Sequence, residues 1–244
     1  QQKLREQLLQ VMKYLNQLYQ NVIKLNQQIV DKGLVKLTWG NASGIDRVNE
    51  RVVIKPSGID VSKLEPSDLS KVTLSTGVNL KGGKPSVDTP THIQIYKHFE
   101  EVNYVIHTHS KYCTAFAQAR RPINCYGTTH ADYFYGDIPV VYDLLENEVK
   151  NDYEKKVGLS IVNYFRDNKI DYKLMPGCLL PNHGVYVWGA SKKQALENAI
   201  VIEEIAELAF LSEKIRVCDH KLPRFLLDKH FDRKHGSTKY YGQR

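Results

Sequence analysis

The sequence predicts an α/β protein in which a mostly antiparallel sheet carries helices on its faces. Three observations lead to this fold class. Apolar residues recur at helical spacing near both ends of the chain. Short runs of β-branched and aromatic residues lie between those ends, and segments rich in Gly, Pro, Asn and Ser separate the runs. A chain of 244 residues with 42% hydrophobic residues can bury one sizeable core, so we expect residues 1–244 to form a single domain.

Residues 1–30 form the first predicted helix, an N-terminal extension. Apolar residues alternate there at spacings of four and three, which is typical of a helical seam. The seam consists of Leu4, Leu8, Val11, Leu15, Leu18, Val22, Leu25 and Ile29. We expect this helix to pack on the core of its own chain. A coiled coil between chains uses the same spacing and is the alternative.

The elements that follow are short. Residues 36–39 and 51–54 are predicted strands, and the Gly-Asn-Ala-Ser-Gly run of residues 40–44 is expected to be the turn between them. Residues 68–74 are a third predicted strand. Residues 81–85, Lys-Gly-Gly-Lys-Pro, form a predicted turn.

The middle of the chain alternates between helices and strands. After Pro90 we expect a short helix over residues 91–99, then a strand over 104–109. A helix over residues 110–120 and a short strand over 138–142 complete this part.

Two longer helices follow. Residues 146–168 are predicted to be one helix, with Tyr153, Val157, Ile161 and Tyr164 along one side. Ser191 precedes Gln194 by three residues, the spacing of a capping box, and predicts a helix that ends near residue 215. Its inward residues are expected to be Ala195, Ala199, Ile202, Ala206 and Ala209.

Composition excludes some classes of protein. No apolar run approaches the roughly 20 residues of a membrane-spanning helix, and the start of the chain is unlike a signal peptide. The four cysteines show no paired metal spacing, which favours reduced thiols and a cytoplasmic location. The net charge of +7 is concentrated from Lys214 to Arg244, where nine Lys or Arg and three Asp give +6. No nucleic-acid-reading motif accompanies this charge, so we expect neither a nucleic-acid nor a membrane partner.

A carboxylate and three histidines predict a metal site. His107 and His109 are two residues apart at the end of a predicted strand, so their side chains are expected on one face. Asp88 lies upstream, and His183 lies in a Pro-Asn-His-Gly turn between two apolar runs. Three imidazoles and one carboxylate suit a zinc ion. Single histidines elsewhere are expected to be structural; they are His92, His98 and His220.

Three other constellations suggest substrate chemistry. Lys55, Ser57 and Gly58 end a strand with an ammonium, a hydroxyl and an open backbone N–H, which can hold a phosphate. Asp132 lies among aromatic residues, an arrangement suited to proton transfer. The tail over residues 228–244 is rich in His, Tyr and basic residues, and we expect it to be ordered over an anionic substrate.

With these residues laid out, the chain resembles the class II aldolase and epimerase superfamily, and within it the L-ribulose-5-phosphate 4-epimerases. The similarity extends from Leu37 to Gln243. The motifs that carry it are residues 38–41, 54–58, 88–92, 107–110, 127–136 and 240–243. The resemblance implies a single-domain, three-layer fold with a central antiparallel sheet between helix layers. It also implies homotetramers with active sites between subunits.

The resemblance also implies roles for particular residues. The implied zinc ligands are Asp88, His107, His109 and His183, with Mn²⁺ or Co²⁺ as possible substitutes. The implied substrate and phosphate pocket consists of Gly40, Asn41, Lys55, Ser57, Gly58 and Ser86. Asp132 and Tyr241 correspond to the pair that exchanges protons with the substrate, and Glu154 and His230 to residues that assist. The implied reaction is inversion at C4 of L-ribulose 5-phosphate, giving D-xylulose 5-phosphate, by retro-aldol and aldol steps.

The alternative enzyme is a class II aldolase that releases dihydroxyacetone phosphate and an aldehyde. The epimerases have Asp at the first metal position where the fuculose-type aldolases have Glu, and Asp88 therefore favours the epimerase. A non-catalytic protein of this fold is disfavoured because all four implied ligands are present. Two departures remain: Val87 replaces a serine common in the family, and about a dozen N-terminal residues have no counterpart in its shorter members.

Overall fold

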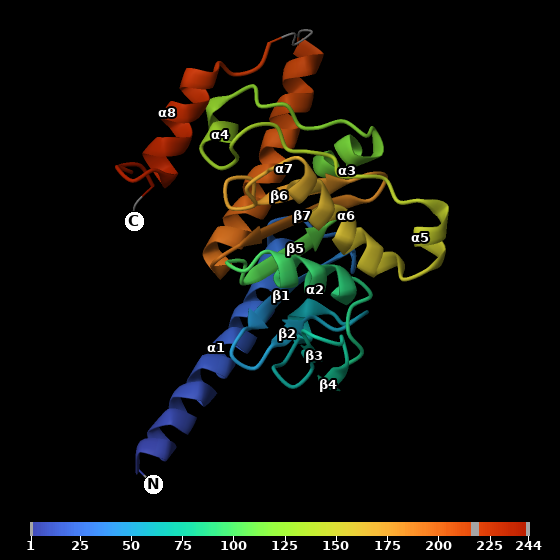
Figure 1. The fold of residues 1–244 in the computed structure, drawn as a ribbon, viewed down its shortest axis with the longest axis vertical. Coiled ribbons are helices and arrows are strands. Elements are labelled where there is room, and N and C mark those ends of the chain that lie inside the picture. The colour runs from blue at the N-terminus through green and yellow to red at the C-terminus, as the bar shows by residue number, and fades with distance from the viewer. Residues whose placement is uncertain (1, 216–219, 243–244) are drawn as a thin grey trace.

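The computed structural model describes residues 2–215 and 220–242. In these residues seven strands form one sheet in the order β4-β3-β2-β1-β5-β7-β6, and each pair of neighbours is antiparallel (Figure 1). The strands are β1 (Gly40–Asp46), β2 (Arg51–Ile54), β3 (Ser70–Thr73), β4 (Asn79–Lys81), β5 (Tyr104–Thr108), β6 (Gly177–Leu180) and β7 (Gly184–Gly189).

Helices cover both faces of this sheet. At Gly44 the sheet faces α1 (Gln2–Asp31). A Cβ added to Gly44 would lie only 2.8 Å from Leu18 Cδ1 of that helix. The neighbouring Ser43 points the other way and bonds to His92 and Tyr96 of α2 (Thr89–His98). Successive strand residues alternate between faces, so α1 and α2 lie on opposite sides. Against α1 packs α7 (Lys192–Ile215), and against α2 packs α6 (Tyr153–Asp167). The predicted α/β class with a central antiparallel sheet is confirmed.

The first strand is not where the sequence predicted it. Residues 36–39 are a turn, and β1 is the Gly-Asn-Ala-Ser-Gly run that was predicted to be a turn. Small residues are required here because β1 lies between two strands and under α1. A Cβ at Gly40 would lie 2.9 Å from the carbonyl oxygen of His107. Turn-like composition therefore reflects close packing at this position.

Two other predicted elements are wrong. Residues 138–142 make only isolated bridges, at Ile138 and Val140, because Pro139 between them has no N–H to extend a ladder. The predicted helix over residues 146–168 is two helices, α5 (Glu146–Lys150) and α6. Asp152 interrupts it with a left-handed backbone, at a φ of 56°. The interruption places Tyr153 and Glu154 at the start of α6.

Strand β2 is confirmed with the predicted bounds. The other predicted elements are confirmed with shifted ends; they are β3, β5, α2, α3 (Lys111–Gln118) and α7. Ser191 Oγ accepts the N–H of Gln194 at 3.1 Å, and the Gln194 side chain accepts the N–H of Ala190 instead of that of Ser191. Three further helices are α4 (Thr128–Ala131), α8 (Arg224–His235) and the 3₁₀ helix η1 (Val61–Lys63).

One hydrophobic core joins α1, the sheet, α2, α6 and α7. The helix α1 enters it only from Leu18 onward, whereas Val11 and Met12 are exposed. The expectation that the whole seam packs on its own chain is therefore wrong for the first half of α1. Cys113, Cys125 and Cys178 are buried free thiols; Cys218 lies outside the described residues. Among the described helices, none combines the length and apolar character needed to cross a bilayer.

Candidate active site

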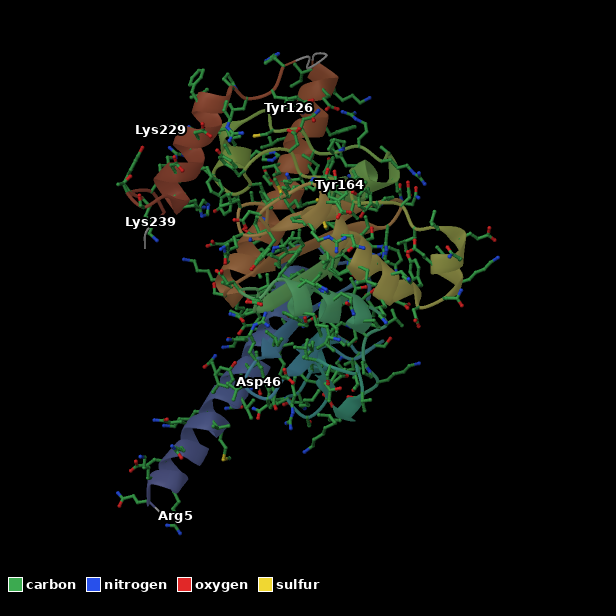
Figure 2. The ribbon with its side chains drawn as sticks, viewed as in Figure 1. Arg5, Asp46, Tyr126, Tyr164, Lys229 and Lys239 are labelled. Atoms are coloured by element: carbon green, nitrogen blue, oxygen red, sulfur yellow. The ribbon has the colours of Figure 1, made fainter. Side chains whose placement is uncertain are left out.

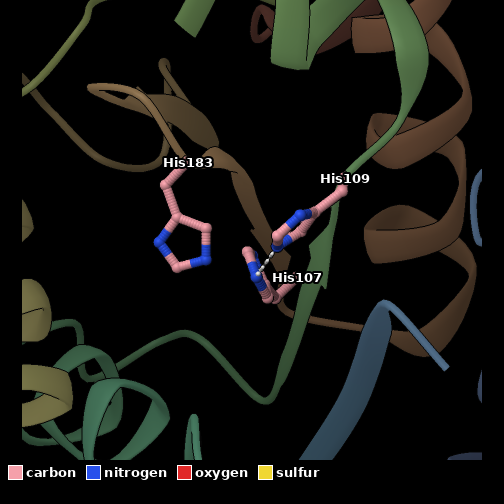
Figure 3. A group of neighbouring side chains, drawn as sticks. All are labelled: His107, His109 and His183. Carbon is pink, nitrogen blue, oxygen red and sulfur yellow. Dashed lines mark hydrogen bonds between the residues drawn. The ribbon is translucent and has the colours of Figure 1, made fainter. Parts of the chain in front are cut away.

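Three histidines converge where β5 meets the β6–β7 hairpin. His107 is in β5, His109 directly follows that strand, and His183 is in the turn before β7. Their ring centroids are 4.8–4.9 Å apart, and one nitrogen from each ring lies within 4.8 Å of the other two. Figure 3 shows the three rings facing a common centre. The His-x-His spacing and the hairpin turn therefore bring together the histidines that the sequence predicted.

Hydrogen bonds and burial fix the chemical state of these rings. His107 Nδ1 lies 3.0 Å from the carbonyl oxygen of Val185, which can only accept, so Nδ1 carries the proton. His107 Nε2 is then a lone-pair donor. Burial lowers the pKa of His107 well below its usual value, and the neighbouring histidines lower it further. Burial likewise lowers the pKa of His109 and His183. Neutral imidazoles are the form that binds a metal.

The spacing of the nitrogen atoms fits zinc. His107 Nε2 and His109 Nε2 are 3.1 Å apart. Two nitrogens bound tetrahedrally at about 2.0–2.1 Å from one zinc ion are separated by about 3.4 Å. His183 Nδ1 lies 3.5 Å from the Tyr153 hydroxyl, which leaves its other ring nitrogen toward the centre (Figure 3). The cluster can therefore accept a divalent ion with small movements of the rings.

Asp88 lies beside the histidines but outside this tight group. It precedes the first turn of α2, and its Oδ2 accepts a 2.6 Å hydrogen bond from Asn41 Nδ2. Its charge opposes the fall in the pKa of both His109 and His183, so it lies close to these rings. Asn41 is paired with His107 in the β1–β5 register. The hydrogen bond from Asn41 therefore holds Asp88, at the start of α2, next to the site.

A buried layer behind His107 fixes the plane of its ring. Tyr186 is its cross-strand neighbour on β7 and stacks on it, with ring centroids 4.3 Å apart. His92 meets Tyr186 edge-on and shares a 2.7 Å hydrogen bond with Ser43. Burial lowers the pKa of His92 to about 3. The prediction that His92 is structural agrees with this position, since it supports the site from behind.

The predicted phosphate residues lie on β1 and on the loops that follow β2 and β4. Lys55 directly follows β2 and is only 4% exposed, yet among the described residues its Nζ bonds to one neutral acceptor, the carbonyl oxygen of Pro56 at 3.2 Å. Burial lowers the pKa of Lys55, and Asp88 raises it in opposition. A cavity of about 300 Å³ is lined by Lys55, Gly40 and Gly58 together with residues of α1.

Ser57 and Ser86 lie on the adjoining loops. The two loops are joined because the N–H of Ser57 donates to the carbonyl oxygen of Lys84. Ser86 Oγ accepts a 3.1 Å hydrogen bond from Asn41 Nδ2. Asn41 Oδ1 is buried and has no partner among the described residues. The sequence-predicted pocket is thus contiguous with the histidines through Asn41.

Asp132, His230 and Tyr241 form a second cluster between α4 and α8. Asp132 Oδ1 accepts from His230 Nδ1 at 3.1 Å, and both carboxylate oxygens accept from Arg233, at 3.0 and 2.8 Å. The Arg233 guanidinium carbon lies 4.2 Å from the ring centroid of Tyr241. Asp132 was expected among aromatic side chains, and the structure instead holds it by two basic groups.

Sequence reasoning missed Arg233, the residue that joins these groups. It lies three residues after His230 on α8, a spacing that puts both on one helix face and could have revealed it. The cluster does not adjoin the histidines in this chain. The helix α4 packs on α7 and α8, and Figure 1 shows α4 and α8 beyond the end of the sheet. Of the predicted tail, residues 243–244 lie outside the described part.

Glu154 lies at the start of α6, on the histidine side. Its backbone carbonyl accepts the hydroxyl of Thr91, which ties α6 to α2. It lines a cavity of about 440 Å³ with Ser86 and Val87. The neighbouring Tyr153 lines a second cavity, of about 480 Å³, with His183. Both cavities border the candidate site.

Comparison with known proteins agrees with this geometry. Residues 20–210 match the family model for class II aldolase and adducin N-terminal domains. An L-fuculose 1-phosphate aldolase structure is 22% identical with a TM-score of 0.73, over 89% of this chain and 95% of that one. YgbL of Klebsiella pneumoniae, described as a candidate aldolase/epimerase/decarboxylase, is 24% identical with a TM-score of 0.70, over 88% and 98%. YgbL of Escherichia coli is 22% identical with a TM-score of 0.72, over 88% and 98%. At these identities the structural likeness establishes the fold.

Proposed function

Because the chain belongs to the class II aldolase and adducin N-terminal domain family, we propose that it is a zinc-dependent enzyme that inverts C4 of L-ribulose 5-phosphate to give D-xylulose 5-phosphate. The observation that carries the metal-dependent class is the cluster of three neutral imidazoles beside Asp88. A zinc ion held by His107, His109, His183 and Asp88 would act as a Lewis acid toward substrate oxygens.

A phosphorylated substrate suits the buried ammonium of Lys55. The Lys55 cation is 4% exposed and bonded to one carbonyl, and within residues 2–215 and 220–242 it has no charged partner at hydrogen-bond distance. A phosphate in the adjoining cavity would supply that charge, with Ser57 and the N–H of Gly58 as further donors. The unpartnered Asn41 Oδ1 offers an acceptor for a substrate hydroxyl between Lys55 and the histidines.

Epimerisation requires two proton-transfer groups. One group removes the proton from the C4 hydroxyl, and the C3–C4 bond breaks to leave glycolaldehyde phosphate and the enediolate of dihydroxyacetone. The aldehyde turns, the same bond reforms on its other face, and the second group returns a proton to the new C4 alkoxide. Asp132 and Tyr241 are proposed for these roles, because Arg233 holds the two side chains next to each other.

The two halves of this machinery are separate within one chain. The Asp132 cluster rests on α4 and α8, and the histidines rest on β5 and the β6–β7 hairpin. We therefore propose that a complete site combines the histidines of one copy with Asp132, His230 and Tyr241 of another. A cyclic homotetramer would provide such a head-to-tail contact four times.

An aldolase is the second candidate. It is favoured by the name of one similar structure, an L-fuculose 1-phosphate aldolase. An aldolase would release the aldehyde, whereas an epimerase must retain it. The short Asp88 side chain, fixed by Asn41 at 2.6 Å, favours the epimerase by its resemblance to that group.

Product analysis separates the two. Zinc-loaded protein is incubated with L-ribulose 5-phosphate, and D-xylulose 5-phosphate, dihydroxyacetone and glycolaldehyde phosphate are measured together, with His109→Asn as the control. We expect D-xylulose 5-phosphate with only traces of the two cleavage products. Stoichiometric dihydroxyacetone and glycolaldehyde phosphate identify an aldolase, and turnover of L-fuculose 1-phosphate alone rejects the pentose assignment.

A further inference from the structure

The first half of α1 carries an apolar face that the described part of the chain leaves largely exposed. On this face Val11, Met12 and Tyr14 have exposed fractions of 45%, 67% and 48%, and Leu15 is half-buried. From Leu18 the same helix is buried against the sheet. Figure 1 shows the N-terminal half of α1 projecting past the sheet, and Figure 2 shows Arg5 near its tip, away from the side chains of the main body.

The seam of α1 keeps one phase through the buried and the projecting halves. Leu18 and Val22 lie on it and pack on β1 around Gly44, and Val11 precedes Leu18 by one heptad. The projecting half, at about 1.5 Å per residue, extends the seam by roughly 20 Å. A seam that repeats every 3.5 residues on average is complementary to another helix with the same repeat. The covering partner is therefore expected to be a helix.

The residues beside this seam favour a second copy of α1. The positions next to Val11 and Leu15 that would face a partner helix hold Met12 and Tyr14, which are uncharged. Two copies can therefore approach without opposed like charges at these positions. Of the nine polar residues over positions 2–17, five are Gln or Asn, three are Lys or Arg and one is Glu, whereas helices that lie on membranes have polar faces rich in Lys and Arg.

We propose that residues 9–15 of α1 form a self-association surface, which packs against the same segment of a second copy of this chain. Val11 and Leu15 would lie at the centre, with Met12 and Tyr14 at its sides. The surface is distinct from the candidate active site, since it is on the part of α1 that leaves the sheet. It therefore adds a contact between copies that does not depend on the proposed reaction.

A matched pair of variants tests the surface. Val11→Glu puts a charge on the apolar face, and Gln10→Glu puts the same charge on the adjacent residue, which lies off the seam and is exposed. Mass is measured by analytical ultracentrifugation over a dilution series. We expect Val11→Glu to weaken association by about tenfold or more and Gln10→Glu to match the wild-type chain. Circular dichroism and zinc content per chain should be equal in all three proteins. Equal association of both variants overturns the proposal.

A distance measurement identifies what α1 contacts. A nitroxide is attached to Gln10→Cys, and spin–spin distances are measured by pulsed electron resonance, with the wild-type chain as the labelling background. Paired α1 helices, with axes about 8–10 Å apart, should give distances under about 35 Å that disappear when Val11→Glu is added. Longer distances only would show that α1 docks on another face. Sedimentation with phosphatidylserine vesicles that is lost in Val11→Glu would assign the face to a membrane. Either result rejects self-pairing.

Discussion

The histidine cluster and the Asp132 cluster are built by different means. The histidines are fixed by strand register: His107 is 1% exposed, stacked on Tyr186 and bonded to the carbonyl oxygen of Val185. The Asp132 cluster is fixed by charge, through Arg233 and His230 of α8. Among the described residues, α8 is buried through Leu227 and Phe231 alone.

This difference separates the two chemical tasks. A metal site needs ligands held to within a few tenths of an ångström, and the buried end of an inner strand supplies that rigidity. A proton-transfer group must face the substrate from another side, and a surface helix can present it outward. In the proposed enzyme, one chain would assemble the metal-binding part by itself and would present the proton-transfer part to another copy.

Loss of the metal should have the largest effect. His109→Asn removes a central donor and should lower turnover by about 10⁴-fold, because Lewis-acid stabilisation contributes several kcal/mol. Zinc content should fall well below one ion per chain while circular dichroism stays unchanged. Metal analysis and steady-state kinetics check both. Full zinc content with normal turnover would contradict the role given to the histidine cluster.

Loss of the proton-transfer group should be the next largest effect. Asp132→Asn keeps the shape of the side chain but cannot take up a proton, so kcat should fall by at least about 10²-fold with KM nearly constant. Zinc content should stay at the wild-type level because the histidines are on other elements. A change confined to KM would show that Asp132 positions the substrate.

The sequence predicted the histidine cluster because its determinants are local. His-x-His at a strand end and a histidine in a hairpin turn are visible within a few residues. Strand β1 escaped prediction because Gly40 and Gly44 are small for tertiary reasons, under His107 and Leu18. Composition alone assigns such a run to a turn.

The contacts of the second cluster could not be read in the same way. Arg233 is 101 positions from Asp132, and it is one of many basic residues near the end of the chain. Nothing local distinguishes it from a solvated cation. The seam of α1 shows a related limit, because its spacing is the same whether a sheet or a second chain covers it. Periodicity predicts an apolar face and leaves its partner open.

Co-expression of the two variants tests whether each site draws on two copies of the chain. His109→Asn and Asp132→Asn chains, co-expressed with different tags and purified through both, should regain about a quarter of wild-type activity if each site draws on two copies. That fraction follows because about half of the histidine clusters are intact and about half of their neighbours have Asp132. Each homogeneous variant is the control. A mixture as inactive as its components would place both clusters in one copy's own site.

The smallest expected effect concerns Tyr153, which contacts the His183 ring. Tyr153 stands at the break between α5 and α6, and its hydroxyl lies 3.5 Å from His183 Nδ1. Burial raises the pKa of Tyr153, with Glu154 and Asp88 adding to the rise, so the hydroxyl stays neutral and can accept the Nδ1 proton. Partners of this kind orient metal ligands, and their loss costs about 10–100-fold in metal affinity. Tyr153→Phe should therefore weaken zinc binding by about tenfold in competition with a chromophoric chelator.

Tyr164→Phe removes a hydroxyl from the same helix, where the Tyr164 ring packs on Tyr142, and should bind zinc as the wild-type chain does. Equal affinities in the two variants would mean that the backbone of the hairpin turn alone orients His183.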